Sequence, residues 1–146
     1  MIHLTKIISH EASPQATLTL PFANRAKSRF RTSLDDGRVA GLFLERGQVL
    51  EQGDLLSTEG GMIVEVIAAQ EKVSVVKCDD ALLMAKACYH LGNRHVPLQI
   101  NAGRLQYLHD HVLDNMLIGF GLTVQVEMAP FQPGSGAYGN HGHPHH

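Results

Sequence analysis

Histidine dominates the residues of this sequence that could do chemistry. Ten of the 146 residues are His, and four of them lie within the last six positions, at His141, His143, His145 and His146. Neutral imidazole is the commonest borderline metal ligand, and a flexible segment can fold several imidazoles around one divalent ion. The run is interrupted by Gly142 and Pro144, unlike an engineered hexahistidine tag. This segment predicts metal binding, with low selectivity among nickel, zinc and copper.

A second group is His109-Asp110-His111, at the predicted junction of a strand with a helix. Imidazoles two positions apart share a face where the backbone is extended, but they diverge by about 200° in a helix. The positive end of the helix macrodipole would disfavour protonation of His111 and keep it available as a neutral ligand. The other interpretation is an exposed pair in which Asp110 only caps the helix. The spacing favours neither.

His95 stands alone, in the predicted turn Gly92-Asn93-Arg94-His95. One imidazole is too weak a site for a divalent metal. In a two-fold dimer with this turn near the axis, His95 from both subunits would supply two ligands, to which other histidines could add. His3, His10 and His90 have no spacing that suggests a site, and we expect structural roles for them, with His90 at most supporting a ligand.

The first seventy residues predict short strands. Apolar residues alternate with polar ones over 16–22 and 30–34, which is the period of a half-buried strand. Asp36-Gly37 is typical of a tight hairpin turn. Further β-rich runs cover 2–8, 38–44, 54–58 and 62–69. We therefore expect an all-β domain of about six short strands over residues 1–72.

The second half predicts the order βαββαβ, a ferredoxin-like domain over residues 73–130. Its strands are expected at 73–77, 96–101, 104–108 and 122–128. Asp79 or Asp80 would cap the first helix and Gly92 would close it in the left-handed conformation, whereas Asp110 and Gly121 bound the second helix. Residues 131–146, rich in Gly and Pro, are predicted to form a flexible His-rich tail. The fold class is α+β.

Composition and motifs exclude several classes of protein. With 44% hydrophobic residues, 18% charged residues and a formal net charge of −2, the chain is neither a disordered polyelectrolyte nor a histone-like nucleic-acid binder. No apolar run approaches the ~18 residues of a spanning helix, and the first ten residues do not resemble a secretory signal. We expect a cytoplasmic protein.

Enzymatic and RNA-binding alternatives are also disfavoured. An RNA-recognition module needs aromatic side chains on its sheet, and the predicted strands of the second half offer only Tyr107. An acyl-phosphate hydrolase would need an Arg-rich anion-binding loop before the first helix, and the sequence has none there. The sequence also lacks the G-x-S-x-G motif of a nucleophile elbow. The G-x-G-x-x-G match at 134–139 opens no helix, so it does not indicate a dinucleotide-binding site.

Cys78 and Cys88 are too few for a disulfide framework, and Cys88 is expected to be a small core hydrophobe. We expect no enzyme activity.

Four basic residues recur at every second position, at Arg25, Lys27, Arg29 and Arg31. On a strand this spacing lines them along one face. A solvated outer face of a sheet explains the pattern. A docking surface for an acidic partner is the alternative hypothesis.

The chain resembles the UreE family of urease accessory proteins, which are nickel metallochaperones. The resemblance rests on the run Tyr-His-Leu-Gly-Asn-Arg-His-Val-Pro-Leu-Gln-Ile over residues 89–100, on His-Asp-His-Val-Leu-Asp over 109–114, and on Phe120-Gly121-Leu122. Gly136-Ala137-Tyr138-Gly139 before the His-rich end and Leu34-Asp35-Asp36-Gly37 in the first half also match. It implies a β-rich N-terminal domain that binds a partner or peptide, and a C-terminal metal-binding domain that forms a homodimer. The urease accessory GTPase and the urease apoprotein complex are the implied partners.

The resemblance also implies roles for individual histidines. His95 corresponds to an interface nickel ligand contributed by both subunits, His109 and His111 to an auxiliary metal-binding pair, and the terminal cluster to a variable tail. Ni(II) is the implied cargo, with Zn(II) or Cu(II) bound in vitro. Because imidazole sites bind Cu²⁺ more tightly than Ni²⁺, the choice of nickel comes from the resemblance and not from the ligands. A general divalent-metal binding or storage protein is the alternative.

Overall fold

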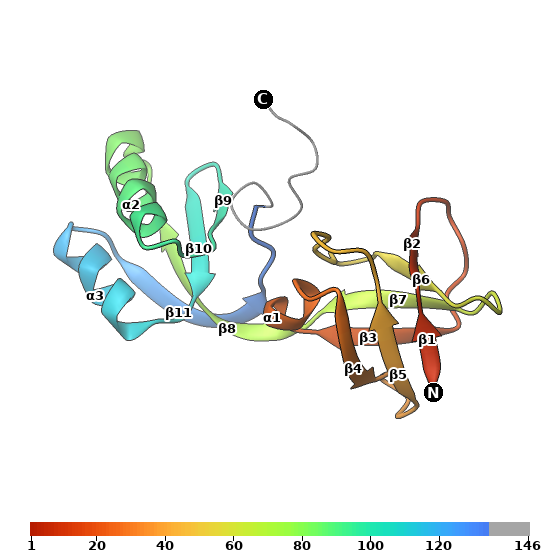
Figure 1. Ribbon diagram of the computed structural model, residues 1–146. Coiled ribbons are helices and arrows are strands. Elements are labelled where there is room, and N and C mark those ends of the chain that lie inside the picture. The colour runs from red at the N-terminus through yellow and green to blue at the C-terminus, as the bar shows by residue number, and fades with distance from the viewer. Residues whose placement is uncertain (135–146) are drawn as a thin grey trace. The chain divides into compact units, whose positions relative to one another are not determined.

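The computed structural model describes residues 1–134 and divides the chain into two compact units. The N-terminal unit covers Met1–Ala69, and the C-terminal unit begins at Gln70 (Figure 1). The mixture of sheets and helices confirms the α+β class. Within residues 1–134, no helix combines the length and the apolar character that crossing a membrane requires.

The N-terminal unit contains two small sheets. In the first, β1 (Ile2–Leu4) pairs in parallel with β5 (Val39–Phe43), which pairs with β4 (Arg29–Ser33). The second has the order β2-β6-β7-β3, formed by Lys6–Ile8, Leu55–Ser57, Ile63–Ala68 and Ala16–Leu20. The predicted strand over 2–8 is thus divided at Thr5 between the two sheets. A leucine-rich core lies among the strands and the loops that follow them. Its fully buried members include Leu4, Leu18, Leu42, Leu50 and Leu56.

The predicted basic stripe is wrong in its first half. A short helix that the sequence did not suggest, α1 (Phe22–Arg25), ends at Arg25 and interrupts the alternation. Arg25 is buried, and its guanidinium donates hydrogen bonds to the carbonyl oxygens of Leu20 (3.1 Å) and Leu50 (3.2 Å). The buried guanidinium therefore links the end of β3 to the backbone at Leu50. Of the four basic residues, only Arg29 and Arg31 lie on strand β4, where both are exposed.

The hairpin at Asp36-Gly37 is confirmed, and Gly37 has a positive φ of 94°. The preceding Asp35 accepts hydrogen bonds from the hydroxyls of Thr17 and Thr19, both at 2.7 Å, and from the Thr19 amide at 3.0 Å. Slight burial raises the pKa of Asp35, but these hydrogen bonds outweigh it and leave the pKa below its ordinary value. Because the threonines lie on β3, this carboxylate links the two sheets.

The C-terminal unit has the predicted order βαββαβ. Its elements are β8 (Gln70–Lys77), α2 (Ala81–Asn93), β9 (Gln99–Asn101), β10 (Arg104–Leu108), α3 (His111–Gly119) and β11 (Val124–Pro130). The antiparallel sheet has the order β11-β8-β10-β9, and β11 runs alongside β8 (Figure 1). Val76, Leu105 and Tyr107 share one face of it, and both helices pack on that face.

The ends of these elements differ from the predictions at several positions. β8 begins at Gln70 and not at 73, β9 begins at Gln99 and not at 96, and β11 covers 124–130 and not 122–128. Asp80 and Asp110 cap the two helices, each accepting two backbone hydrogen bonds, as expected. Gly121 has the predicted positive φ, but Gly92 remains inside α2 without one, so its predicted role as a left-handed cap is wrong.

The segment after β11 is packed on the C-terminal unit as far as Gly134. Phe131 is fully buried, the Gln132 amide donates to the side chain of Gln99 (2.9 Å), and the Gly134 amide donates to the Leu98 carbonyl (3.1 Å). Residues 131–134, the first part of the predicted His-rich tail, therefore make defined contacts with the C-terminal unit. The four histidines of the predicted tail lie outside the described residues.

Candidate metal centre

His109 lies between the end of β10 and the start of α3, and two other residues contact its ring. Its Nδ1 atom is 3.1 Å from the Ser74 hydroxyl on β8 and 3.1 Å from a carboxylate oxygen of Asp114 on α3. The other carboxylate oxygen accepts a 2.6 Å hydrogen bond from the Tyr107 hydroxyl. The His109 side chain is 25% exposed, whereas that of Asp114 is only 9% exposed. One edge of the imidazole is thus held from inside the unit.

Tyr107 remains a hydrogen-bond donor in this arrangement. Burial raises the pKa of its hydroxyl far above the ordinary value, and the hydrogen bond to Asp114 raises it further. Ser74 and Tyr107 are opposite each other in the β8–β10 pairing, so the sheet register brings their side chains to one face. The network joins β8, β10 and α3.

His111 is the first residue of α3, and its side chain is exposed. Asp110 between the two histidines has an extended backbone (φ −149°, ψ 120°), which is the conformation in which flanking side chains point to one side. Asp110 accepts from the amides of Val112 (2.9 Å) and Leu113 (3.0 Å), so the capping role predicted for it is confirmed. This cap places His111 at the positive end of the helix dipole.

His95 is exposed and has an unusual backbone conformation. Its φ is 58°, the only positive value at a residue other than glycine within residues 1–134. Its amide donates to the Gly92 carbonyl at 2.9 Å, directly after the last turn of α2. The left-handed conformation costs roughly 1–2 kcal/mol at a residue with a Cβ atom. Such outliers concentrate at functional sites, where the surrounding structure maintains them.

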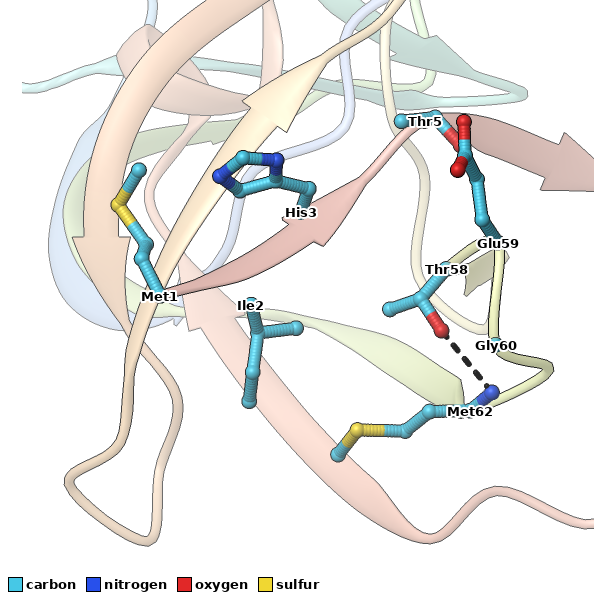
Figure 2. Close-up of a pocket in the computed structure, with 8 residues that line it drawn as sticks. All are labelled: Met1, Ile2, His3, Thr5, Thr58, Glu59, Gly60 and Met62. Carbon is cyan, nitrogen blue, oxygen red and sulfur yellow. Dashed lines mark hydrogen bonds between the residues drawn. The ribbon is translucent and has the colours of Figure 1, made fainter.

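The other histidines of the described chain lie apart from these positions. The His90 ring stacks at a tilt on Phe120, with centroids 4.8 Å apart. His10 is exposed. His3 contacts the Phe43 ring edge-on at 5.0 Å and lines a pocket of the N-terminal unit (Figure 2). In Figure 2 the Glu59 carboxylate lies apart from the His3 ring, so these two groups do not converge.

No three His, Cys, Asp or Glu side chains within residues 1–134 form a group that could hold a metal ion. The structure therefore does not bring His95 together with His109 and His111 in one chain. Cys78 and Cys88 are free thiols that line a pocket beside Met84. Burial raises the pKa of Cys88, and its side chain packs against the core as predicted.

Ser74, Tyr107 and Asp114 are not among the residues that the sequence predicts for a site. The sequence suggests Tyr107 only as an aromatic side chain for stacking. Asp114 carried a usable signal, because it is a carboxylate next to the apolar positions Leu113 and Leu117 of a predicted helix. A charged group in such a position needs a polar partner. Nothing in the sequence indicated that His109 would be that partner.

Comparison with known proteins agrees with this architecture. The protein-family model for the C-terminal domain of UreE urease accessory protein matches residues 71–146. The family model for its N-terminal domain matches residues 3–69. The chain belongs to the UreE family. It is 58% identical to the urease accessory protein UreE of Alkalilimnicola ehrlichii, over 95% of this chain and 85% of that protein. It is 57% identical to the UreE of Citrobacter koseri, over 100% and 97% of the two chains.

The two UreE family models meet at the division between the two structural units. The C-terminal model covers every predicted metal ligand, from His95 to His146. The N-terminal model covers the unit that contains Arg29, Arg31 and the Asp35 network. The UreE of Escherichia coli O157:H7 is 53% identical over 99% of this chain and 95% of that protein.

Proposed function

We propose that this UreE-family chain is a cytoplasmic nickel metallochaperone that supplies Ni(II) for assembly of the urease active site. The observation that carries the proposal is His95, an exposed imidazole held in a strained left-handed turn of the C-terminal unit. Strain at a surface residue needs a compensating reason, and metal binding by the side chain is one. Membership in a family of urease accessory proteins supports nickel as the metal.

The proposed nickel site is formed by a homodimer of the C-terminal domain, the part of the chain predicted over residues 73–130. One His95 from each subunit supplies two imidazole ligands. Large apolar side chains that are 46% to 73% exposed on this unit support such an interface. They are Leu82, Tyr89, Ile100, Val112, Ile118, Val126 and Met128. Tyr89 and Ile100 flank the His95 turn in sequence.

A chaperone must release its cargo, and this ligand set suits release. Imidazoles shared across a subunit surface bind a divalent ion without enclosing it, so a partner can offer further ligands and remove the metal. His109 and His111 are proposed as the auxiliary pair. His141, His143, His145 and His146 are proposed to add binding capacity. Zn(II) and Cu(II) would bind to the same groups in vitro.

The proposal is tested by His95→Ala in the full-length protein. We expect loss of the tightest nickel site per dimer in calorimetric titration, with circular dichroism and dimer mass unchanged. His10→Ala, which removes another exposed imidazole, is the matched control. A tight nickel site that persists in His95→Ala would contradict the proposal. In a urease maturation assay at limiting nickel, the wild type should raise the nickel content of urease, whereas a storage protein would lower it.

The N-terminal domain, predicted over residues 1–72, is proposed to dock the maturation machinery, which comprises the accessory GTPase and the urease apoprotein complex. Arg29 and Arg31 lie on the exposed face of β4, and the register places them opposite Phe43 and Gly41 of β5. Phe43 is 39% exposed, so this face combines positive charge with an apolar centre. Such a face fits an acidic partner.

Charge reversal tests this docking surface. The double variant Arg29→Glu, Arg31→Glu should reduce capture of the accessory GTPase by more than tenfold, because two attractive contacts become repulsive. Nickel affinity should stay unchanged. Lys6→Glu, on a different sheet, is a control for charge reversal away from this surface. If the double variant captures the GTPase as well as the wild type does, the two arginines are not part of the interface.

A further inference from the structure

We infer that Asp114 is a positioning residue that holds the His109 ring with its proton on Nδ1 and leaves Nε2 free to bind metal. The inference rests on the proposed role of His109 as an auxiliary ligand. It adds a residue that contacts no metal itself and acts through the orientation of the imidazole.

The direction of the hydrogen bond follows from the identity of its partners. The carboxylate of Asp114 can accept hydrogen bonds but has no proton to donate when ionised. One of its oxygens already accepts from the Tyr107 hydroxyl at 2.6 Å, and the other faces His109 Nδ1 at 3.1 Å. An unprotonated Nδ1 at that distance would place a lone pair against a negative oxygen. Nδ1 therefore carries the proton, and Nε2 carries the free lone pair.

The carboxylate is itself fixed from the interior. Asp114 is buried on α3, where its amide donates to the Asp110 carbonyl at 2.9 Å within the first turn. Tyr107, which is fully buried, anchors one carboxylate oxygen. Ser74 contacts Nδ1 from the β8 side at 3.1 Å, so the ring edge has protein groups on two sides. Rotation of the imidazole would break contacts on two elements at once.

Metal-binding histidines commonly donate their second ring N–H to a carboxylate, which fixes the tautomer and makes the ligating nitrogen more basic. The contacts of His109 Nδ1 with Asp114 and Ser74 match this arrangement. His95 and His111 differ, since neither side chain has a hydrogen bond within the described part of the chain. Loss of such a carboxylate typically weakens metal binding by about 10- to 100-fold.

The test uses full-length protein with ¹⁵N-labelled histidine, in which the ring nitrogens report the tautomer by NMR. His109→Ala assigns the His109 signals. Their loss during Ni(II) titration measures nickel binding at this one residue. Asp114→Asn keeps the shape of the side chain, but its amide nitrogen can donate to Nδ1 and drive the proton to Nε2. Asp110→Asn is the matched control, because it removes one nearby negative charge, retains a good helix cap and does not touch the His109 ring.

We expect wild-type His109 to carry its proton on Nδ1. Asp114→Asn should shift the tautomer and raise the nickel concentration that removes the His109 signals by at least tenfold, with Asp110→Asn close to wild type. A wild-type ring protonated on Nε2 would overturn the inference without any variant, even if Asp114→Asn failed to fold. Unchanged tautomer and affinity in folded Asp114→Asn would also overturn it. If nickel saturates the other histidines without affecting His109 in the wild type, the failure lies in the proposed ligand role.

Discussion

His95 and His109 lie in the same structural unit, yet their side chains are held in opposite ways. His95 is exposed, has no side-chain hydrogen bond within the described chain, and is placed by a left-handed backbone at the end of α2. His109 has an ordinary backbone, and its ring is held by Ser74 and Asp114. The two imidazoles therefore differ in how freely each ring can move. In the proposed function, the loosely held His95 would suit metal transfer, whereas the anchored His109 would suit retention until transfer.

The comparison predicts that the two histidines affect stability differently. His109→Ala removes a partner of Asp114 and leaves one oxygen of a buried carboxylate without its hydrogen bond. We expect a loss of about 1–3 kcal/mol in the free energy of unfolding, measured by urea denaturation. His111→Ala, at an exposed position two residues away, should stay within about 0.5 kcal/mol of the wild type. Equal stability of the two variants would mean that the Asp114 network does not need the imidazole.

A smaller difference in the free energy of unfolding is expected between two replacements of His95. Glycine tolerates a φ of 58°, whereas alanine retains the steric conflict between Cβ and backbone. His95→Gly should therefore be more stable than His95→Ala by about 1 kcal/mol in the same denaturation experiment. Both variants should lose the tightest nickel site equally, because both lack the imidazole. If the two variants unfold at the same urea concentration, the left-handed turn carries no strain, and the contrast with His109 loses its basis.

Much of the fold was predictable because it depends on local signals. The caps Asp80 and Asp110, the turn residues Gly37 and Gly121, and the order βαββαβ all follow from residue type and spacing along the chain. The errors arose where distant groups competed with the local pattern. Arg25 fits an alternating strand in sequence, but the carbonyl oxygens of Leu20 and Leu50 draw its guanidinium into the core.

The end of α2 was also not predictable from local signals. A glycine near a helix terminus predicts a left-handed cap, and Gly92 had that position in the sequence. The helix instead continues to Asn93, Arg94 becomes its C-cap, and His95 takes the positive φ. The hydrogen bond from the His95 amide to the Gly92 carbonyl closes this turn. A one-turn extension of a helix is decided by small energy differences that local residue preferences do not resolve.

The sequence by itself determined which groups could bind metal, because imidazole chemistry belongs to the residue and its clustering is visible without a fold. It also determined the family, since the motifs around His95 and His109 are contiguous. Only the tertiary structure decided how each imidazole is held. Asp114 and His109 are close in sequence, but Ser74 reaches the ring, and Tyr107 reaches Asp114, only through the β8–β10 register and the packing of α3. Orientation and tautomer depend on such contacts between distant segments, and composition and spacing do not encode them.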